Sequence, residues 1–268
     1  MEYQEVSPSP ALRDVVQCTW FLRDAPEAAG RVEAIFPDGR GEIVVNHADR
    51  FAAVDEPPGT LQPRSIAVGQ MREPLRIAPT GTVDLAGVRL RPAGLWALLG
   101  VPMTELTGRR IDLDALDPAL RRDLDAAARR RGGDAVRAER IEAVLLRRLH
   151  HRRRPSDAVV RAIAAIERSG GRIRIDDLAD GLSARTLERR FAREVGLPPK
   201  VLARIVRFQG VLRRVEHTAP IDWARLAIDG GYFDQAHLIR DFRELAGTSP
   251  ERYRRDVHAM SDRFVHGS

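Results

Sequence analysis

The chain has 268 residues, of which 43% are hydrophobic and 31% charged, and a formal net charge of +6. This length predicts two domains at ~150 residues each. No run of about 18 or more apolar residues occurs, which argues against a membrane-spanning helix, and the first residues lack the apolar segment of a secretory signal. The single cysteine, Cys18, has no partner for a disulfide, so we expect a reducing cytoplasm and a buried apolar role for Cys18.

The positive charge is concentrated in the second half of the chain. Residues 1–146 carry 19 basic and 22 acidic side chains, a net charge of −3, whereas residues 147–268 carry 25 and 16, a net charge of +9. Only Lys200 is a lysine, so the arginine content in general reflects a compositional bias. The uneven distribution nevertheless indicates that a polyanion would bind the C-terminal part.

Short strands separated by Pro- and Gly-containing turns are predicted over the first ~90 residues. The expected strands are Cys18–Leu22, Val32–Phe36, Glu42–Val45, Arg50–Val54, Ser65–Gly69, Leu75–Ile77 and Val83–Leu90. Regular strand–turn spacing without a helical period is typical of a small all-β barrel or sandwich.

Helices are predicted from Pro92 onward. The first three cover 94–99, 118–131 and 134–151, and the last has an apolar stripe that includes Ile141 and Leu145. This stripe predicts packing either on the barrel or on a second copy of the helix. A basic run that ends at Pro155 indicates a domain boundary. The fold class is therefore α+β in two domains: a β-barrel or sandwich with trailing helices at 1–153, and an all-α domain at 154–268.

The predicted helices of the C-terminal domain contain a repeat. They cover 157–169, 176–181, 183–195, 199–216, 222–228, 234–245 and 250–256. Five residues recur at a constant offset of 51, namely Leu187, Arg189, Phe191, Gly196 and Pro199 with Leu238, Arg240, Phe242, Gly247 and Pro250. Each copy follows a short apolar helix and a Gly-containing turn, which is typical of a helix-turn-helix. Two such units would place two recognition helices about one DNA turn, roughly 34 Å, apart.

The side chains that face away from the repeated Leu and Phe have the chemistry of base recognition. Arginine pairs with guanine, Glu accepts from cytosine, Gln pairs with adenine and an Ala methyl contacts thymine. The candidate base contacts are Arg185, Glu188, Arg189, Gln235, Ala236, His237 and Arg240. Helix N-termini and nearby polar side chains are candidates for phosphate contacts. These are Ser183, Arg193, Lys200, Arg204, Thr248, Ser249, Arg252 and Arg254.

Residues ~157–256 resemble the C-terminal domain of the AraC/XylS transcriptional regulators. The resemblance rests on Ile175-x-x-Leu178-Ala179, Ser183-x-x-x-Leu187-x-Arg189-x-Phe191, Gly196-x-x-Pro199, Gly231-Tyr232-x-Asp234-x-x-x-Leu238-x-Arg240-x-Phe242 and Gly247-x-Ser249-Pro250. It implies two helix-turn-helix subdomains joined by a long helix, with the base contacts named above. The chain departs from the family pattern at Ala236-His237-Leu238, which removes a polar contact, and at Asp241, which we expect to bring negative charge near the duplex.

The β-rich half is similar to the cupin-like sensing module of such regulators. A pocket for a small-molecule effector is expected at Trp20, Phe36, Val44 and Trp96, although these side chains are also typical of an ordinary core. His47 is the only histidine in the expected strands, so no metal site and no cofactor are predicted. The sequence offers no catalytic arrangement of Ser, His, Asp or Cys and no phosphate-binding loop.

These observations predict a cytoplasmic transcriptional regulator rather than an enzyme. Its expected partners are double-stranded DNA, a small-molecule effector, a second copy in a homodimer and, for an activator, RNA polymerase. Two alternatives stay open: a β-barrel enzyme with a DNA-binding tail, and an architectural protein that binds DNA without sequence preference.

Overall fold

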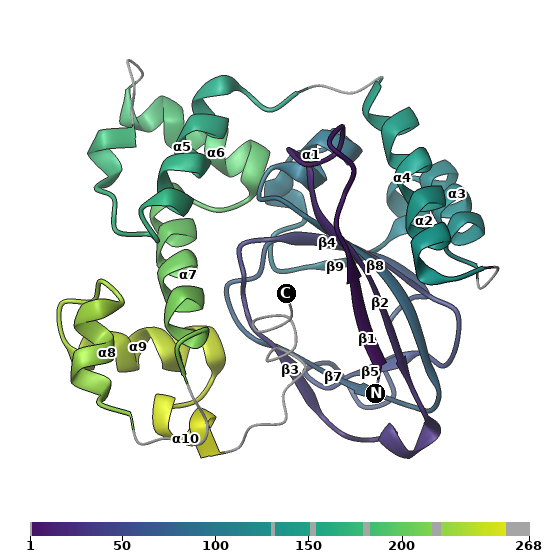
Figure 1. The fold of residues 1–268 in the computed structure, drawn as a ribbon, viewed down its shortest axis with the longest axis horizontal. Coiled ribbons are helices and arrows are strands. Elements are labelled where there is room, and N and C mark those ends of the chain that lie inside the picture. The colour runs from purple at the N-terminus through teal and green to yellow at the C-terminus, as the bar shows by residue number, and fades with distance from the viewer. Residues whose placement is uncertain (1, 130–131, 151–153, 179–182, 216–220, 256–268) are drawn as a thin grey trace.

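A β-rich N-terminal half is followed by a helical C-terminal half (Figure 1). The structure is a computed structural model that describes residues 2–129, 132–150, 154–178, 183–215 and 221–255. The boundary expected at residue 153 lies outside these residues, as do Ala179 and Gly181 of the first predicted turn.

Six antiparallel strands form the main sheet, in the order β1-β2-β8-β4-β6-β9. They are β1 (Glu2–Val6), β2 (Val16–Asp24), β8 (Val83–Leu90), β4 (Gly41–Asn46), β6 (Ser65–Val68) and β9 (Arg110–Asp112). The central strand β8 is buried along its whole length. Its Gly87 pairs with Trp20, whose indole occupies the space that a Cβ at Gly87 would need. This close approach lets the indole lie across the sheet.

A second, three-stranded antiparallel sheet has the order β3-β7-β5. Its strands are β3 (Glu33–Ile35), β7 (Leu75–Pro79) and β5 (Phe51–Ala53). The N-terminal half is thus built on two antiparallel sheets that do not close into one barrel. All seven expected strands are present, and β1 and β9 are two strands that the sequence pattern did not reveal.

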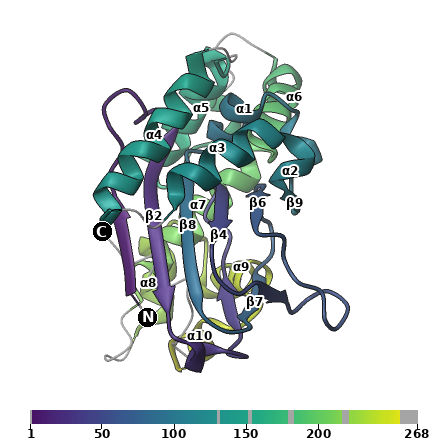
Figure 2. The ribbon, with the colours of Figure 1, turned by 90° about the vertical axis from the view of Figure 1, so that its right-hand side faces the viewer.

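Helices cover one face of the six-stranded sheet, as Figure 2 shows for α3 and α4. They are α1 (Gly94–Leu99), α2 (Leu113–Leu116), α3 (Pro118–Ala128) and α4 (Asp134–His150), with 3-10 turns η1 (Pro26–Ala28) and η2 (Met103–Glu105) in the same half. Helix α4 packs on α3 and on β1 and β2. Ile141 and Leu145 of its apolar stripe are buried in the same core as residues of the sheet. Of the two expectations for this helix, packing on the β domain is the one observed.

The C-terminal half consists of short helices around a central one. They are α5 (Asp157–Arg168), the 3-10 turn η3 (Ile175–Leu178), α6 (Ala184–Val195), α7 (Pro199–Leu212), α8 (Trp223–Asp229), α9 (Gln235–Ala246) and α10 (Pro250–Arg255). Each matches a helix expected from the sequence. Helix α7 spans about 21 Å at 1.5 Å per residue. It contacts both α5 and α9, so it joins the two parts of the repeat.

The two halves share a hydrophobic core. Phe36 and Ala93 of the β-rich half belong to the same cluster of buried residues as the C-terminal helices. The Phe36 ring lies edge-on to Phe208 of α7 and Tyr253 of α10, with centroids 6.4 and 5.7 Å away. Within the described ranges, no helix is long and apolar enough to cross a membrane.

Candidate DNA-binding surface

Helices α6 and α9 begin and end in the same way. Ser183 caps α6 by accepting a hydrogen bond from the backbone N–H of Thr186, and Asp234 caps α9 by accepting from that of His237. Each helix ends at a glycine in the left-handed conformation, Gly196 (φ +91°) and Gly247 (φ +67°). Such caps satisfy backbone groups that a helix end leaves open. The 51-residue repeat is therefore a repeat of two equally bounded helices.

Both helices bury the repeated Leu and Phe and expose the opposite side. Leu187, Phe191, Leu238 and Phe242 are each at most 1% exposed. The proposed base contacts on the other side are exposed, except for His237, which is half-buried: Arg185, Glu188, Arg189, Gln235, Ala236 and Arg240. The inward anchoring expected from the sequence is thus present in both units, and polar side chains face solvent from each.

The turn before α9 contacts His237 of that helix and exposes Phe233. The His237 ring lies edge-on to Tyr232 at 5.1 Å, and its Nδ1 accepts a 3.5 Å hydrogen bond from the Phe233 N–H. An apolar residue just before a helix cap usually packs on the first turn of the helix. Phe233 is instead 86% exposed. The sequence pattern did not single out Phe233 as a functional residue, although its position next to the helix cap was an available signal.

The candidate phosphate contacts divide into two groups. Ser183, Lys200 and Arg252 are exposed, and the half-buried Ser249 caps α10 by accepting from the Arg252 N–H. The others are tied to protein groups or partly covered. The Arg193 guanidinium lies 5.2 Å from the centre of the Trp96 ring. Arg254 pairs with Glu251 at 3.0 Å. The buried Thr248 hydroxyl has no hydrogen-bond partner among the described residues.

Arg204, which is partly exposed, pairs with the buried Asp241 between α7 and α9. Arg204 Nε donates to Asp241 Oδ1 at 2.7 Å, its other nitrogen contacts Glu244, and Arg207 lies 3.8 Å from the second Asp241 oxygen. Asp241 is only 3% exposed. Asp241 was expected to bring negative charge near the duplex, but its carboxylate is covered and pairs with Arg204, which was expected to contact phosphate.

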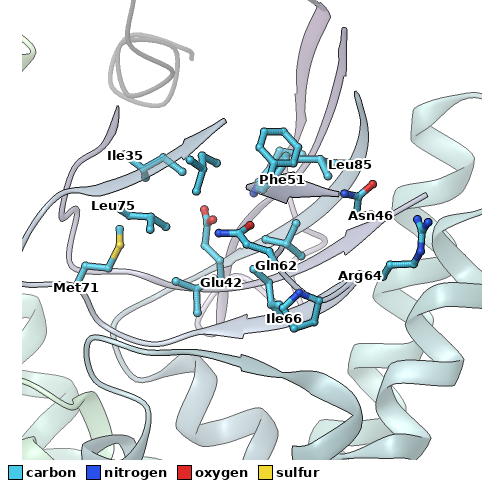
Figure 3. A pocket seen from close by; sticks show the side chains of 15 residues that line it. Ile35, Glu42, Asn46, Phe51, Gln62, Arg64, Ile66, Met71, Leu75 and Leu85 are labelled. Carbon is cyan, nitrogen blue, oxygen red and sulfur yellow. The ribbon is translucent and has the colours of Figure 1, made fainter. Parts of the chain in front are cut away.

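A cavity lies between the two sheets (Figure 3). Trp20 and Val44 line it, as expected, together with Ile35, Phe51, Leu75 and Leu85. The volume of the cavity that is open to the centre of a water molecule is about 60 Å³.

Two residues expected in this pocket lie elsewhere. Phe36 follows β3 into the C-terminal core, and Trp96 belongs to the core beneath the helices on the other face of the main sheet. The sequence identified both as buried aromatic residues but could not assign them to a layer. Cys18 is also buried, as expected, and burial raises the pKa of its thiol to about 12. Among the described residues no group of three or more His, Cys, Asp or Glu side chains could hold a metal ion.

Two capped helices with buried Leu and Phe and exposed polar faces are consistent with the paired helix-turn-helix units that the sequence predicts. Comparison of sequences agrees: residues 178–256 match the family described as a helix-turn-helix domain, and residues 4–112 match a domain of unknown function, DUF6597. No curated protein matches the chain. Residues 178–256 therefore form a helix-turn-helix domain of the kind that the resemblance implied, and this domain supports a DNA-binding regulator. This assignment points away from an enzyme.

The solved structures that are similar to the chain include a domain of AraT and two structures of ToxT. The C-terminal domain of AraT, a response regulator from Geobacillus stearothermophilus, is 23% identical over 41% of this chain and 93% of that one, with a TM-score of 0.36. ToxT from Vibrio cholerae is 9% identical over 92% and 99%, with a TM-score of 0.47. ToxT bound to (E)-4-(8-methylnaphthalen-1-yl)but-3-enoic acid is 10% identical over 87% and 98%, with a TM-score of 0.46.

Proposed function

We propose that this regulator recognises specific DNA sequences through α6 and α9 and responds to a small molecule bound between its two sheets. Residues 1–153 would form the sensing unit and residues 154–268 the DNA-binding unit. The observation that carries the proposal is the matched pair of recognition helices, each anchored by a buried Leu and Phe. Their equal caps and equal exposed faces fit two successive contacts with one duplex.

The exposed faces supply the groups that distinguish base pairs in the major groove. Arg185, Arg189 and Arg240 would donate to guanine, and Glu188 would accept from cytosine. On α9, Gln235 would pair with adenine, while Ala236 and the exposed Phe233 would contact thymine methyl groups. The His237 imidazole would make a hydrogen bond to a base edge.

Phosphate contacts would position these helices. Ser183, Lys200, Ser249 and Arg252 are the groups best placed to supply them, since they lie at the N-terminal ends of α6, α7 and α10. Arg254 would contribute beside Arg252. Arg193 is exposed beside the Trp96 ring and could also contribute, whereas contacts by Arg204 or the buried Thr248 hydroxyl would require these groups to leave their present positions.

Residues 37–40 connect the cavity with the DNA-binding unit. Gln209 of α7 donates to the Pro37 carbonyl oxygen at 2.8 Å, and Arg40 pairs with Glu167 of α5 at 2.8 Å. The same segment leads directly into β4, whose Val44 lines the cavity. A ligand that displaces β4 would therefore change the contacts that hold α5 and α7, and with them the orientation of the recognition helices.

Selection of binding sites from random duplexes with the full chain tests the recognition role. We expect one enriched sequence and, in competition at rising salt, at least a ~10³-fold preference for it over unrelated DNA. Equal affinity for all sequences would instead identify an architectural protein.

Two further partners belong to this proposal. An activator would contact RNA polymerase, and a homodimer would place two copies on adjacent operator sites. Transcription from the selected operator with purified polymerase, and sedimentation of the protein with and without that operator, test these two interactions directly.

A further inference from the structure

The strand register places one acidic side chain in the apolar cavity. Along β4, Ile43 and Val45 belong to the core beneath the helices, whereas Glu42, Val44 and Asn46 line the cavity. This alternation follows from the two-residue period of a strand. Figure 3 shows the Glu42 carboxylate projecting into the centre of the cavity, beside Gln62.

The other polar side chains of the cavity differ in whether their hydrogen-bonding groups have partners. The Asn46 amide donates to the Asp49 carbonyl oxygen and accepts from the Ala48 N–H, and Arg64 donates to the Ala48 carbonyl oxygen. By contrast, Gln62 Nε2 is buried without a hydrogen-bond partner among the described residues. A buried amide nitrogen without a partner carries a free-energy cost that a ligand acceptor would remove.

Glu42 belongs to a cluster with more negative than positive charge. Arg89, only 3% exposed, lies within 2.9 Å of Glu42, 3.3 Å of Glu5 and 3.7 Å of Asp38. The single Arg89 guanidinium thus forms ion pairs with three carboxylates. Burial raises the pKa of Glu42, although Arg89 and the Trp20 side chain favour its ionised form. A further cation at the cavity side of Glu42 would complete the compensation.

The cavity borders the space between the two halves of the chain. Val68, Met71 and Leu75 line both the cavity and a large groove whose other wall includes Val201 and Gly247 of the helical half. A ligand could therefore enter from this groove, and its size is limited. One water molecule needs about 10–15 Å³ of such space. The cavity volume of about 60 Å³ therefore admits only a small organic group.

We propose that the cavity binds a small apolar molecule with a protonated amine, which pairs with Glu42 while its apolar body contacts Trp20, Phe51 and Leu85. Gln62 would donate to an acceptor on the same molecule. The inference rests on the proposed function, because it assigns a chemical class to the effector of that cavity.

Three probes of similar size and different charge test the assignment: benzylamine, benzyl alcohol and benzoate. Each is titrated into the full chain, and binding is followed by calorimetry and by the NMR signal of the Trp20 indole N–H. We expect benzylamine to bind at least tenfold more tightly than the other two. Glu42→Gln should abolish this preference while Arg89 retains Glu5 and Asp38. Glu5→Gln is the matched control, since it removes the same charge from the cluster outside the cavity, and it should keep the preference.

The amine assignment and the effector function are tested by different outcomes. Equal or tighter binding of benzyl alcohol or benzoate, or no binding of benzylamine, overturns the amine assignment. Because this comparison uses the unaltered chain, it holds even if Glu42→Gln does not fold. The effector function is tested separately by Val44→Phe, which fills the cavity. If this variant has the same operator affinity as the parent, and no bound probe alters that affinity, the proposed effector function fails whatever the charge preference.

Discussion

At the scale of single residues, Arg189 has the surroundings of a base-contacting side chain. It is exposed, two positions from each of the buried anchors Leu187 and Phe191. We predict that Arg189→Ala costs ~1–3 kcal/mol of operator binding and relaxes selectivity at one base pair. Competition with operators mutated one base pair at a time measures both effects. Arg190→Ala removes the same charge from the same helix and should leave base preference unchanged. An equal loss on every sequence would contradict the role of Arg189.

His47 couples the stability of the β-rich half to pH. Burial lowers the pKa of His47, and Asp125, 3.8 Å away, opposes this only in part. The unfolded chain therefore binds more protons than the folded one as pH falls from about 7, near the ordinary histidine pKa of ~6.5. Stability from neutral His47 is complete above that value and is lost as pH falls through the lower folded-state pKa.

We accordingly predict that His47→Gln flattens the decrease in unfolding free energy between about pH 7 and pH 5. Urea denaturation of both proteins at a series of pH values measures this slope. His150→Gln, at the exposed end of α4, is the control for loss of an imidazole. An unchanged slope for His47→Gln would show that burial of this ring does not govern the pH response.

At the scale of elements, the caps of α6 and α9 fix where the recognition helices begin. Asp234 accepts from the His237 N–H at 2.7 Å. We predict that Asp234→Ala lowers the unfolding free energy by ~0.5–2 kcal/mol and weakens operator binding, because α9 then begins without a bound N–H group. Thermal denaturation and operator titration measure the two effects. Asp229→Ala, at the exposed end of α8, should change neither appreciably.

Local signals account for the elements that the sequence predicted well. Helices α6, α8 and α9 carry their own side-chain caps, and the helices of the C-terminal half show apolar periods, so their positions follow from short segments. Strands β1 and β9 lack such signals: β1 is half exposed without strict alternation, and β9 has three residues, none of them buried. Two open sheets in place of a barrel result from pairings such as β6 with β9, which join residues far apart in sequence.

The same distinction explains the candidate sites. Helical spacing correctly separated buried Leu187 from exposed Arg189, because both face assignments depend on one helix alone. It could not show that Arg204 would pair with Asp241, or that Phe36 would enter the helical core, because those contacts join separate elements.

At the scale of the whole molecule, one buried hydrogen bond links the two halves through Gln209. Its amide donates to the Pro37 carbonyl oxygen, and the Gln209 side chain is largely buried. We predict that Gln209→Ala costs ~1–3 kcal/mol of stability, because the carbonyl loses its partner. It should also reduce the effect of cavity ligands on operator affinity. Urea denaturation and operator titration with and without ligand measure these changes, with the exposed Gln17→Ala as control. A full ligand response in Gln209→Ala would exclude this link from signalling.

The C-terminal end of α6 limits how the two halves of such a protein can be exchanged with those of another protein. The Thr107 hydroxyl donates to the Gly196 carbonyl oxygen at 2.7 Å, and a Cβ at Gly196 would press against Thr107 and Met103. The β-rich half thus supplies a hydrogen bond at the C-terminal end of α6. A chimera that joins residues 154–268 to a different N-terminal domain would lose the hydrogen bond from Thr107 to Gly196. We therefore expect an active hybrid to need residues 103–107 of this chain as well.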